Sequence, residues 1–169
     1  GAYVAVIIEN ERDEELGDGE PPQLPGGSLM IFDTADEALR TVELTGIADL
    51  FPEDPEPEFV DINSANVAVV TFQENNYIAL IDLASGEVTG SFSAGTANLD
   101  QIDTAEEDVI TFNSSLSDVP REPDAVTWIS DSMFATADEG DLYGGSRGFT
   151  IFDTYGNIIY DAGNTVEHI

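Results

Sequence analysis

The sequence predicts an all-β chain that forms a segment of a β-propeller, with about three four-stranded antiparallel blades in an incomplete ring. Three observations support this prediction. The same arrangement of two β-rich runs, the first ending in an acid and the second ending in Asp, occurs three times along the chain. Turn residues such as Ser85-Gly86 and Tyr155-Gly156-Asn157 separate alternating runs, as hairpins require. Two of the three units also follow a further strand-like run that opens with Glu-Pro.

Each unit is a pair of β-rich runs joined by a loop. The runs cover residues 3–10 and 28–33, 67–75 and 77–82, and 133–140 and 148–153. The acids near the ends of the first runs, Glu9, Glu74 and Glu139, are 65 residues apart in both intervals. The second runs close on Asp residues, namely Asp33, Asp82 and Asp153. Because Asp bonds readily to the backbone that follows it, we expect these three residues to form turns.

The repeat divides one propeller domain, residues 1–169, into blades. The predicted blades are a partial first blade at about 1–50, a second at about 56–96 and a third at about 120–169. Long acidic loops are expected at 11–27 and 97–118, with short helical turns near 100–107 and 47–51. Three unrelated hairpins in a β-sandwich are the alternative that the pattern leaves open. Whole four-stranded units in regular succession favour blades.

Three blades do not close a ring, because propellers have about 4–8 of them. An open set of sheets would expose apolar faces and strand edges. We therefore expect the remaining blades to come from the same protein or from other chains, and self-assembly of the chain is one way to supply them.

The chain is strongly acidic, with 35 Asp and Glu residues against 4 Arg, no Lys and a formal net charge of -31. Nucleic acid and anionic membrane surfaces need a basic face, so neither is expected as a partner. The charge favours cations, basic partners or a salty medium, and the lack of Lys suggests a halophilic or marine source. The absence of Cys excludes disulfides and Cys-ligated zinc. No apolar run approaches the ~20 residues of a membrane span.

The last third of the chain carries a tract that resembles a known family. It runs through Arg121-Glu122-Pro123-Asp124-Ala125-Val126, Phe134-Ala135-Thr136-Ala137-Asp138-Glu139-Gly140-Asp141 and Gly145-Ser146-Arg147-Gly148-Phe149-Thr150-Ile151-Phe152. The tract resembles the choice-of-anchor I family of secreted β-propellers, which is similar to mesenchyme-specific cell-surface glycoproteins and to alkaline-phosphatase-like propellers. The resemblance implies an exported, calcium-linked propeller, extracellular or at the cell surface, and leaves its activity open.

Carboxylates at repeated strand ends are the first candidate site. In a propeller the ends of inner strands line the axial channel or its mouth, so Glu9, Glu74 and Glu139 are predicted to converge there, with Asp138 and Asp141 nearby. Converging carboxylates repel one another unless a cation joins them, and Ca²⁺ accepts about 6–8 hard oxygen ligands. Ca²⁺ is therefore the expected cofactor. The alternative left open is that these acids cap strand ends and bind backbone N–H groups.

The segment Gly144-Gly145-Ser146-Arg147-Gly148 matches the G-x-S-x-G pattern of hydrolase nucleophiles. A nucleophile elbow needs a helix after the pattern, whereas the residues here predict a strand. No catalytic residue is identified, and the only histidine is His168. Arg147 is a candidate phosphate ligand, because a guanidinium matches phosphate bidentately. Arg121 and Arg147 are otherwise expected to tie loops down through paired carboxylates.

Two functions are consistent with these residues. The first is a secreted, acidic, calcium-binding β-propeller that acts in cell-surface adhesion, assembly or mineral contact. The alternative is a metal-dependent phosphoesterase, with a metal cluster at the channel mouth and Arg147 holding phosphate.

Overall fold

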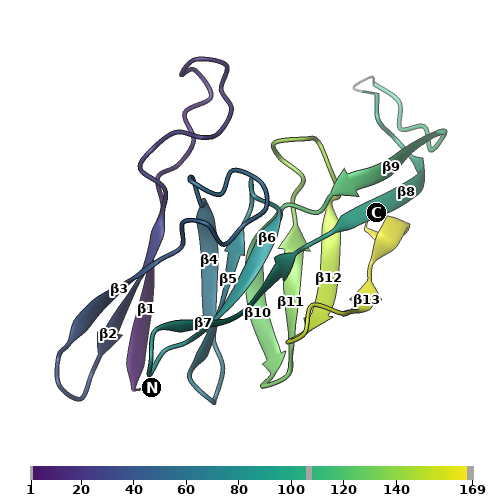
Figure 1. Ribbon diagram of the computed structural model, residues 1–169. Coiled ribbons are helices and arrows are strands. Elements are labelled where there is room, and N and C mark those ends of the chain that lie inside the picture. Colours follow the sequence, from purple (N-terminus) through teal and green to yellow (C-terminus); the bar gives the residue numbers. More distant parts are fainter. Residues whose placement is uncertain (1, 106–107, 167–169) are drawn as a thin grey trace.

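The computed structural model describes residues 2–105 and 108–166, and the regular structure in this part of the chain is almost entirely β. Its 13 strands form four antiparallel sheets, and its only helix is a 3-10 turn, η1 (Gly163–Thr165). Three larger sheets stand side by side in chain order, and a two-stranded sheet lies beside the last of them (Figure 1). The all-β prediction is confirmed, but the fourth sheet departs from the predicted three.

The strands follow one another in chain order within each large sheet. The first sheet consists of β1 (Tyr3–Ile8), β2 (Ser28–Asp33) and β3 (Leu39–Glu43). The central sheet consists of β4 (Pro57–Ile62), β5 (Val67–Phe72), β6 (Tyr77–Asp82) and β7 (Glu87–Ser93). The third sheet consists of β10 (Pro123–Ser130), β11 (Met133–Asp138), β12 (Gly148–Asp153) and β13 (Ile158–Asp161). Among the described residues, the first sheet therefore lacks the strand that corresponds to β4 and β10.

The closing Asp residues make the turns predicted for them. Asp33, Asp82 and Asp153 each accept a hydrogen bond on the carboxylate from a backbone N–H two or three residues further on, at 2.7 to 2.9 Å. These bonds satisfy backbone donors that the hairpin ladder leaves unpaired. The turn chemistry of the repeat is thus confirmed.

The hairpins of the three large sheets share one register. In each sheet the closing Asp pairs with the first residue of the preceding strand, namely Tyr3, Val67 and Met133. Counting from these positions identifies the equivalent residues of the three sheets. Side chains alternate between the two faces of a sheet. One face carries Val4 in the first sheet, Ala68 in the central sheet and Phe134 in the third. The opposite face carries Leu29, Ile78 and Phe149, in the same order.

The central sheet is covered on both of its faces. Ala68 belongs to the core shared with the first sheet, Ile78 belongs to the core shared with the third, and both are 0% exposed. The equivalent positions on the two outer faces are open: Val4 is 47% exposed and Phe149 is 39% exposed. The stack therefore ends on both sides in an apolar face that the described residues do not cover.

The predicted loop 97–118 contains the two-stranded sheet instead. Strand β8 (Thr96–Ile102) pairs with β9 (Ser114–Pro120). The helical turn expected near 100–107 is wrong for its described part, residues 100–105, and residues 106–107 lie outside the described chain. The reason is that burial alternates along this segment: Ala97 and Leu99 are buried while their neighbours are exposed. This period of two residues is that of a strand and not of a helix. Residues 47–51 likewise form bends and no helical turn.

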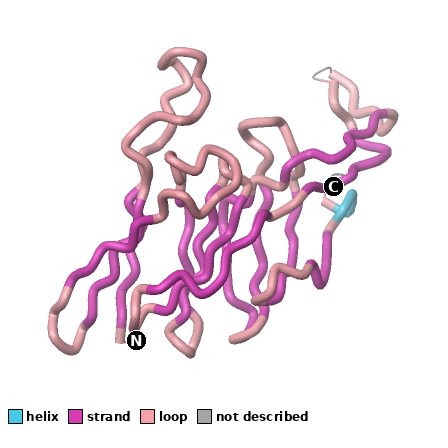
Figure 2. Tube along the Cα trace, viewed as in Figure 1, coloured by secondary structure: helices cyan, strands magenta, loops and turns pink. Residues whose placement is uncertain are grey.

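Loops of unequal length project from one end of the stacked sheets (Figure 2). The β1–β2 loop is the longest, the β11–β12 loop is shorter, and the β5–β6 connection is a tight turn. The three sheets do not close a ring within the described residues. No helix in this part of the chain is long and apolar enough to span a membrane.

Replacing Phe134 by Ala should destabilise the protein by about 3–5 kcal/mol. Phe134 is 0% exposed, and its ring lies 5.4 Å from Trp128 and 5.7 Å from Phe152 between centroids. The substitution leaves a cavity between the central and third sheets. Urea unfolding followed by circular dichroism measures the change. Tyr155→Ala, at a side chain 86% exposed, is the control and should shift stability by under about 0.5 kcal/mol. Equal losses in the two variants would contradict the assigned core.

Candidate functional site

One pocket gathers acidic side chains from all three large sheets. It has a volume of about 350 Å³. Its lining comes from the ends of β1, β5 and β11, the start of β4 and the β1–β2 and β11–β12 loops: Glu9, Glu11, Arg12, Glu14, Glu58, Gln73, Glu74, Glu139 and Asp141. We call this the acidic pocket. Four of the five predicted metal ligands, Glu9, Glu74, Glu139 and Asp141, therefore lie together.

Asp138, the fifth predicted ligand, is engaged elsewhere. Its buried carboxylate accepts hydrogen bonds from the hydroxyls of Thr136 at 2.8 Å and Thr150 at 2.7 Å, and lies 3.7 Å from Nη1 of Arg121. Burial raises the pKa of Asp138, while the two hydroxyls and Arg121 act against the rise. Arg121 also pairs with Asp161, so the expectation that it ties segments together through two carboxylates is confirmed.

The even 65-residue spacing conceals a shift of one residue in the central sheet. Counted from the paired strand starts, Glu9 and Glu139 are equivalent to Gln73, and Glu74 comes one position later. Gln73 takes part in the site as a donor, because its Nε2 gives a hydrogen bond to Oε2 of Glu139 at 2.8 Å. Glu74 reaches the same pocket from the tight β5–β6 turn.

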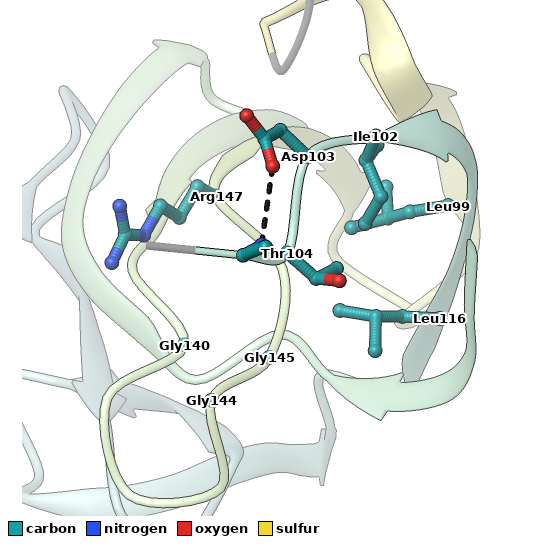
Figure 3. A pocket seen from close by; sticks show the side chains of 10 residues that line it. Leu99, Ile102, Asp103, Thr104, Leu116, Gly140, Gly144, Gly145 and Arg147 are labelled. Atoms are coloured by element: carbon teal, nitrogen blue, oxygen red, sulfur yellow. Dashed lines mark hydrogen bonds between the residues drawn. The ribbon is translucent and has the colours of Figure 1, made fainter. Parts of the chain in front are cut away.

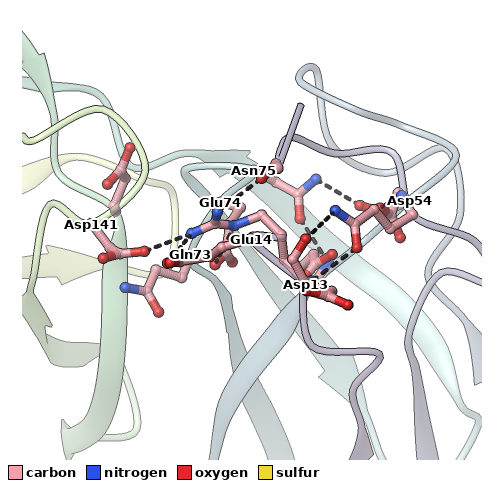
Figure 4. A network of polar contacts seen from close by, with 12 residues as sticks. Asp13, Glu14, Asp54, Gln73, Glu74, Asn75 and Asp141 are labelled. Atoms are coloured by element: carbon pink, nitrogen blue, oxygen red, sulfur yellow. Dashed lines mark hydrogen bonds and ion pairs between the residues drawn. The ribbon is translucent and has the colours of Figure 1, made fainter. Parts of the chain in front are cut away.

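Arg12, which the sequence analysis did not single out, is the cation of the acidic pocket (Figure 4 shows the surrounding polar network). Its Nη2 lies 2.9 Å from Oδ2 of Asp141 and 3.4 Å from Oε1 of Glu14, and its Nε lies 4.0 Å from Oε1 of Glu74. The side chain is only 11% exposed. The available signal was its rarity, since it is one of 4 basic residues among 35 acids and stands in the longest acidic loop.

Glu9 and Glu58 share a hydrogen bond between their carboxyl groups. Burial, followed by the charge of Glu9, raises the pKa of Glu58 to about 7. Burial also raises the pKa of Glu9, and the hydrogen bond from Glu58 opposes that rise. The pair therefore holds a proton near neutral pH, which reduces the repulsion between two carboxylates at one strand end.

Two buried glutamates, Glu56 and Glu122, lie directly before the prolines that open the two four-stranded sheets. Glu56 is 1% exposed, and neither of its carboxylate oxygens has a hydrogen-bond partner. Burial and the charges of Glu74, Asp54 and Glu9 raise its pKa to about 8. The nearby backbone N–H of Arg12 opposes this rise, although its geometry is not that of an ordinary hydrogen bond. Glu122 is 0% exposed, and burial raises its pKa to about 7.

Arg147 does not line the acidic pocket, but it lines a neighbouring cavity of about 630 Å³ with Asp138, Glu139 and Asp141. It lines a larger cavity of about 670 Å³ between the β11–β12 loop and the two-stranded sheet, together with Asp103 and three glycines of that loop (Figure 3). Gly145 packs so tightly there that an added Cβ would lie 2.1 Å from the carbonyl oxygen of Pro120. The segment leads directly into β12 and not into a helix, so the G-x-S-x-G pattern is not a nucleophile elbow.

The oxygen donors of the acidic pocket suit a hard cation by type. Carboxylate oxygens are what Ca²⁺ prefers, and the buried Oε2 of Glu74 has no hydrogen-bond partner. As they stand, however, no three or more Asp, Glu, His or Cys side chains in the described chain are arranged to hold a metal ion. Arg12 supplies positive charge instead, and a bound ion would require the carboxylates to close around it.

Two comparisons with known proteins bear on the chain. The family model of the choice-of-anchor I domain matches residues 32–144, which include the central sheet, the two-stranded sheet and the start of the third. A search of curated proteins finds no match.

Replacing Glu56 by Gln should stabilise the protein at alkaline pH. A carboxyl whose pKa rises from its ordinary 4.5 to about 8 on folding contributes stability that is complete below pH 4.5 and is lost as the pH rises through 8. Gln keeps the shape and carries no charge, so the variant should be more stable than the wild type by roughly 4 kcal/mol at pH 8 and by less than about 1 kcal/mol at pH 5.

Urea unfolding at pH 5, 6.5 and 8 measures this difference. Glu87→Gln removes the same formal charge from an exposed position and is the control. If both variants show the same dependence on pH, the gain comes from general charge reduction and not from Glu56.

Proposed function

Since the chain belongs to the choice-of-anchor I domain family, we propose that it is a segment of a secreted, acidic β-propeller that binds calcium and acts in cell-surface adhesion, assembly or mineral contact. The observation that carries this proposal is the acidic pocket. Seven Asp and Glu residues from the strand ends of three successive sheets and from two loops meet there around a single Arg. Such an excess of carboxylate favours uptake of a cation, because like charges in a confined site raise one another's energy.

The repeated packing of the sheets supports a propeller. In each contact between large sheets, the face that carries Leu29 or its equivalent packs against the face of the next sheet that carries Ala68 or its equivalent. The outer faces at Val4 and Phe149 are the two unused halves of the same contact. Further sheets of the same repeat, from this protein or from other chains, would cover them and extend the stack towards a ring.

The phosphoesterase alternative has less support. It needs Arg147 to hold phosphate beside the metal. Arg147 shares a cavity of about 630 Å³ with Glu139 and Asp141, but it does not line the acidic pocket, where Glu9 and Glu74 lie. Asp138 is also committed to Arg121 and two threonine hydroxyls, so it is not an open metal ligand. We therefore propose a binding and scaffold role, with Glu9, Glu74, Glu139 and Asp141 as the calcium ligands.

Calcium should raise the melting temperature of the chain, and chelation should lower it. An ion that binds only the folded state stabilises it by about 2.7 kcal/mol at a free concentration 100 times the dissociation constant. Glu139→Gln should weaken calcium binding at least several-fold, measured by isothermal titration calorimetry. The matched control Glu87→Gln should leave binding unchanged. If NaCl at equal ionic strength restores the chelated protein fully, the acids act only as a screened surface and the calcium role is wrong.

The uncovered faces should make the chain self-associate in concentrated salt, where screening reduces repulsion between copies. Sedimentation velocity should show species larger than the monomer as concentration rises. Val6→Asp, on the outer face at 47% exposure, should reduce this association, whereas Val109→Asp, at 60% exposure in a loop, should not. A monomer at every concentration tested would contradict the stacking proposal.

A further inference from the structure

We propose that Arg12 is a built-in competitor for calcium, so that the ion and the Arg12 guanidinium exclude one another from the acidic pocket and calcium binding releases the outer part of the β1–β2 loop. This inference rests on the proposed calcium function and adds its regulation. The reasoning starts from the position of the guanidinium, which lies among carboxylates contributed by two other loops.

The Arg12 guanidinium does not supply a hydrogen-bond partner to every buried polar atom of the pocket. Glu74 lines the pocket, its residue surface is only 9% exposed, and its Oε2 has no hydrogen-bond partner. The Nε of Arg12 also lacks a partner, although Oε1 of Glu74 is 4.0 Å away. A buried charged oxygen without a partner is costly, so the pocket has affinity left for a cation that can approach more closely. Ca²⁺ binds oxygen at about 2.3–2.6 Å and meets this requirement.

The two cations cannot share the site. Nη2 of Arg12 already lies 2.9 Å from Oδ2 of Asp141, one of the proposed calcium ligands, and Nε faces Glu74, another. The spread of carboxylates around the guanidinium also explains why no group of three is arranged for a metal in the described chain. Closing them around an ion therefore requires Arg12 to leave, because two positive charges a few ångströms apart repel strongly in a partly buried site.

Departure of Arg12 would be transmitted to its loop. Nη1 of Arg12 donates to the carbonyl oxygen of Gly19 at 2.9 Å, so the outer part of the loop is folded back onto this side chain. The base of the loop has its own attachments, because the side chain of Asn10 donates to the carbonyl oxygen of Gln23 and the backbone N–H of Gln23 donates to Asp54. Asp13 is also held to the base, because its backbone N–H donates to Oε1 of Gln23 and its carbonyl oxygen accepts from Nε2 of Gln23. Residues 14–22 would therefore loosen while the base stays anchored.

Calcium titration of the full chain tests the exclusion. Arg12→Gln should bind Ca²⁺ about tenfold more tightly than the wild type, and Arg12→Lys, which keeps the charge, should stay within about threefold of it. Arg40→Gln makes the same charge change near the opposite end of the sheets, where Arg40 bonds to the carbonyl oxygen of Ala84, and should alter affinity by less than twofold. Circular dichroism checks that each variant is folded.

Hydrogen exchange supplies a second readout that needs no variant. Adding Ca²⁺ to the wild-type chain should speed exchange of the backbone amides in residues 14–22 and leave the amides of β5 unchanged. One outcome overturns the inference and keeps the calcium function. In that outcome Ca²⁺ binds the wild type and Glu139→Gln weakens the binding, but Arg12→Gln behaves like Arg40→Gln and the loop amides do not respond. If neither the wild type nor Arg12→Gln binds Ca²⁺, both proposals are wrong. Should Arg12→Gln not fold, the exchange result alone decides.

Discussion

Burial of the central sheet on both faces is the constraint on which the rest of the structure depends. A sheet with one apolar face needs one neighbour, but β5 and β6 are buried along nearly their whole length and need two. The first and third sheets supply those neighbours and must stand in matching orientation to do so. Their strand ends are then brought to the same side of the stack. The acidic pocket is a consequence of this packing, because it forms where the ends of β1, β5 and β11 meet.

Three features reduce the electrostatic repulsion among the carboxylates gathered at this end of the sheets. Glu9 and Glu58 share a proton, which removes one charge from the start of β4. Glu56 has no partner and keeps its own proton up to a pH of about 8. Arg12 brings positive charge from a loop into the middle of the remaining acids. Each device lowers repulsion without removing the oxygen donors of the pocket.

The two buried glutamates show how local sequence and site are linked. Glu56 and Glu122 both precede the proline that opens the first strand of a sheet, and both are excluded from water. The backbone N–H of Glu56 bonds to the side chain of Asn75, and that of Glu122 bonds to Asn76. These bonds place two equivalent residues at the turn of the central sheet. Glu56-Pro57 and Glu122-Pro123 each mark a strand start, but only their place between sheets makes these carboxyls buried acids.

The sequence by itself determined the all-β class, the repeated hairpins and the turn-forming Asp residues, because alternation and turn chemistry are local properties of the chain. The repeat also predicted the convergence of Glu9, Glu74, Glu139 and Asp141, which the stacking of the sheets brings about. The sequence could not determine the register of the central sheet, where an even spacing of acids hid Gln73 as the true equivalent of Glu9 and Glu139. Nor could it reveal that Arg12 enters the pocket, or that Asp138 turns away to Arg121. Those outcomes were decided by the tertiary structure, since they depend on which loops and faces meet across sheets distant in sequence, and pairwise electrostatics acts only once they have met.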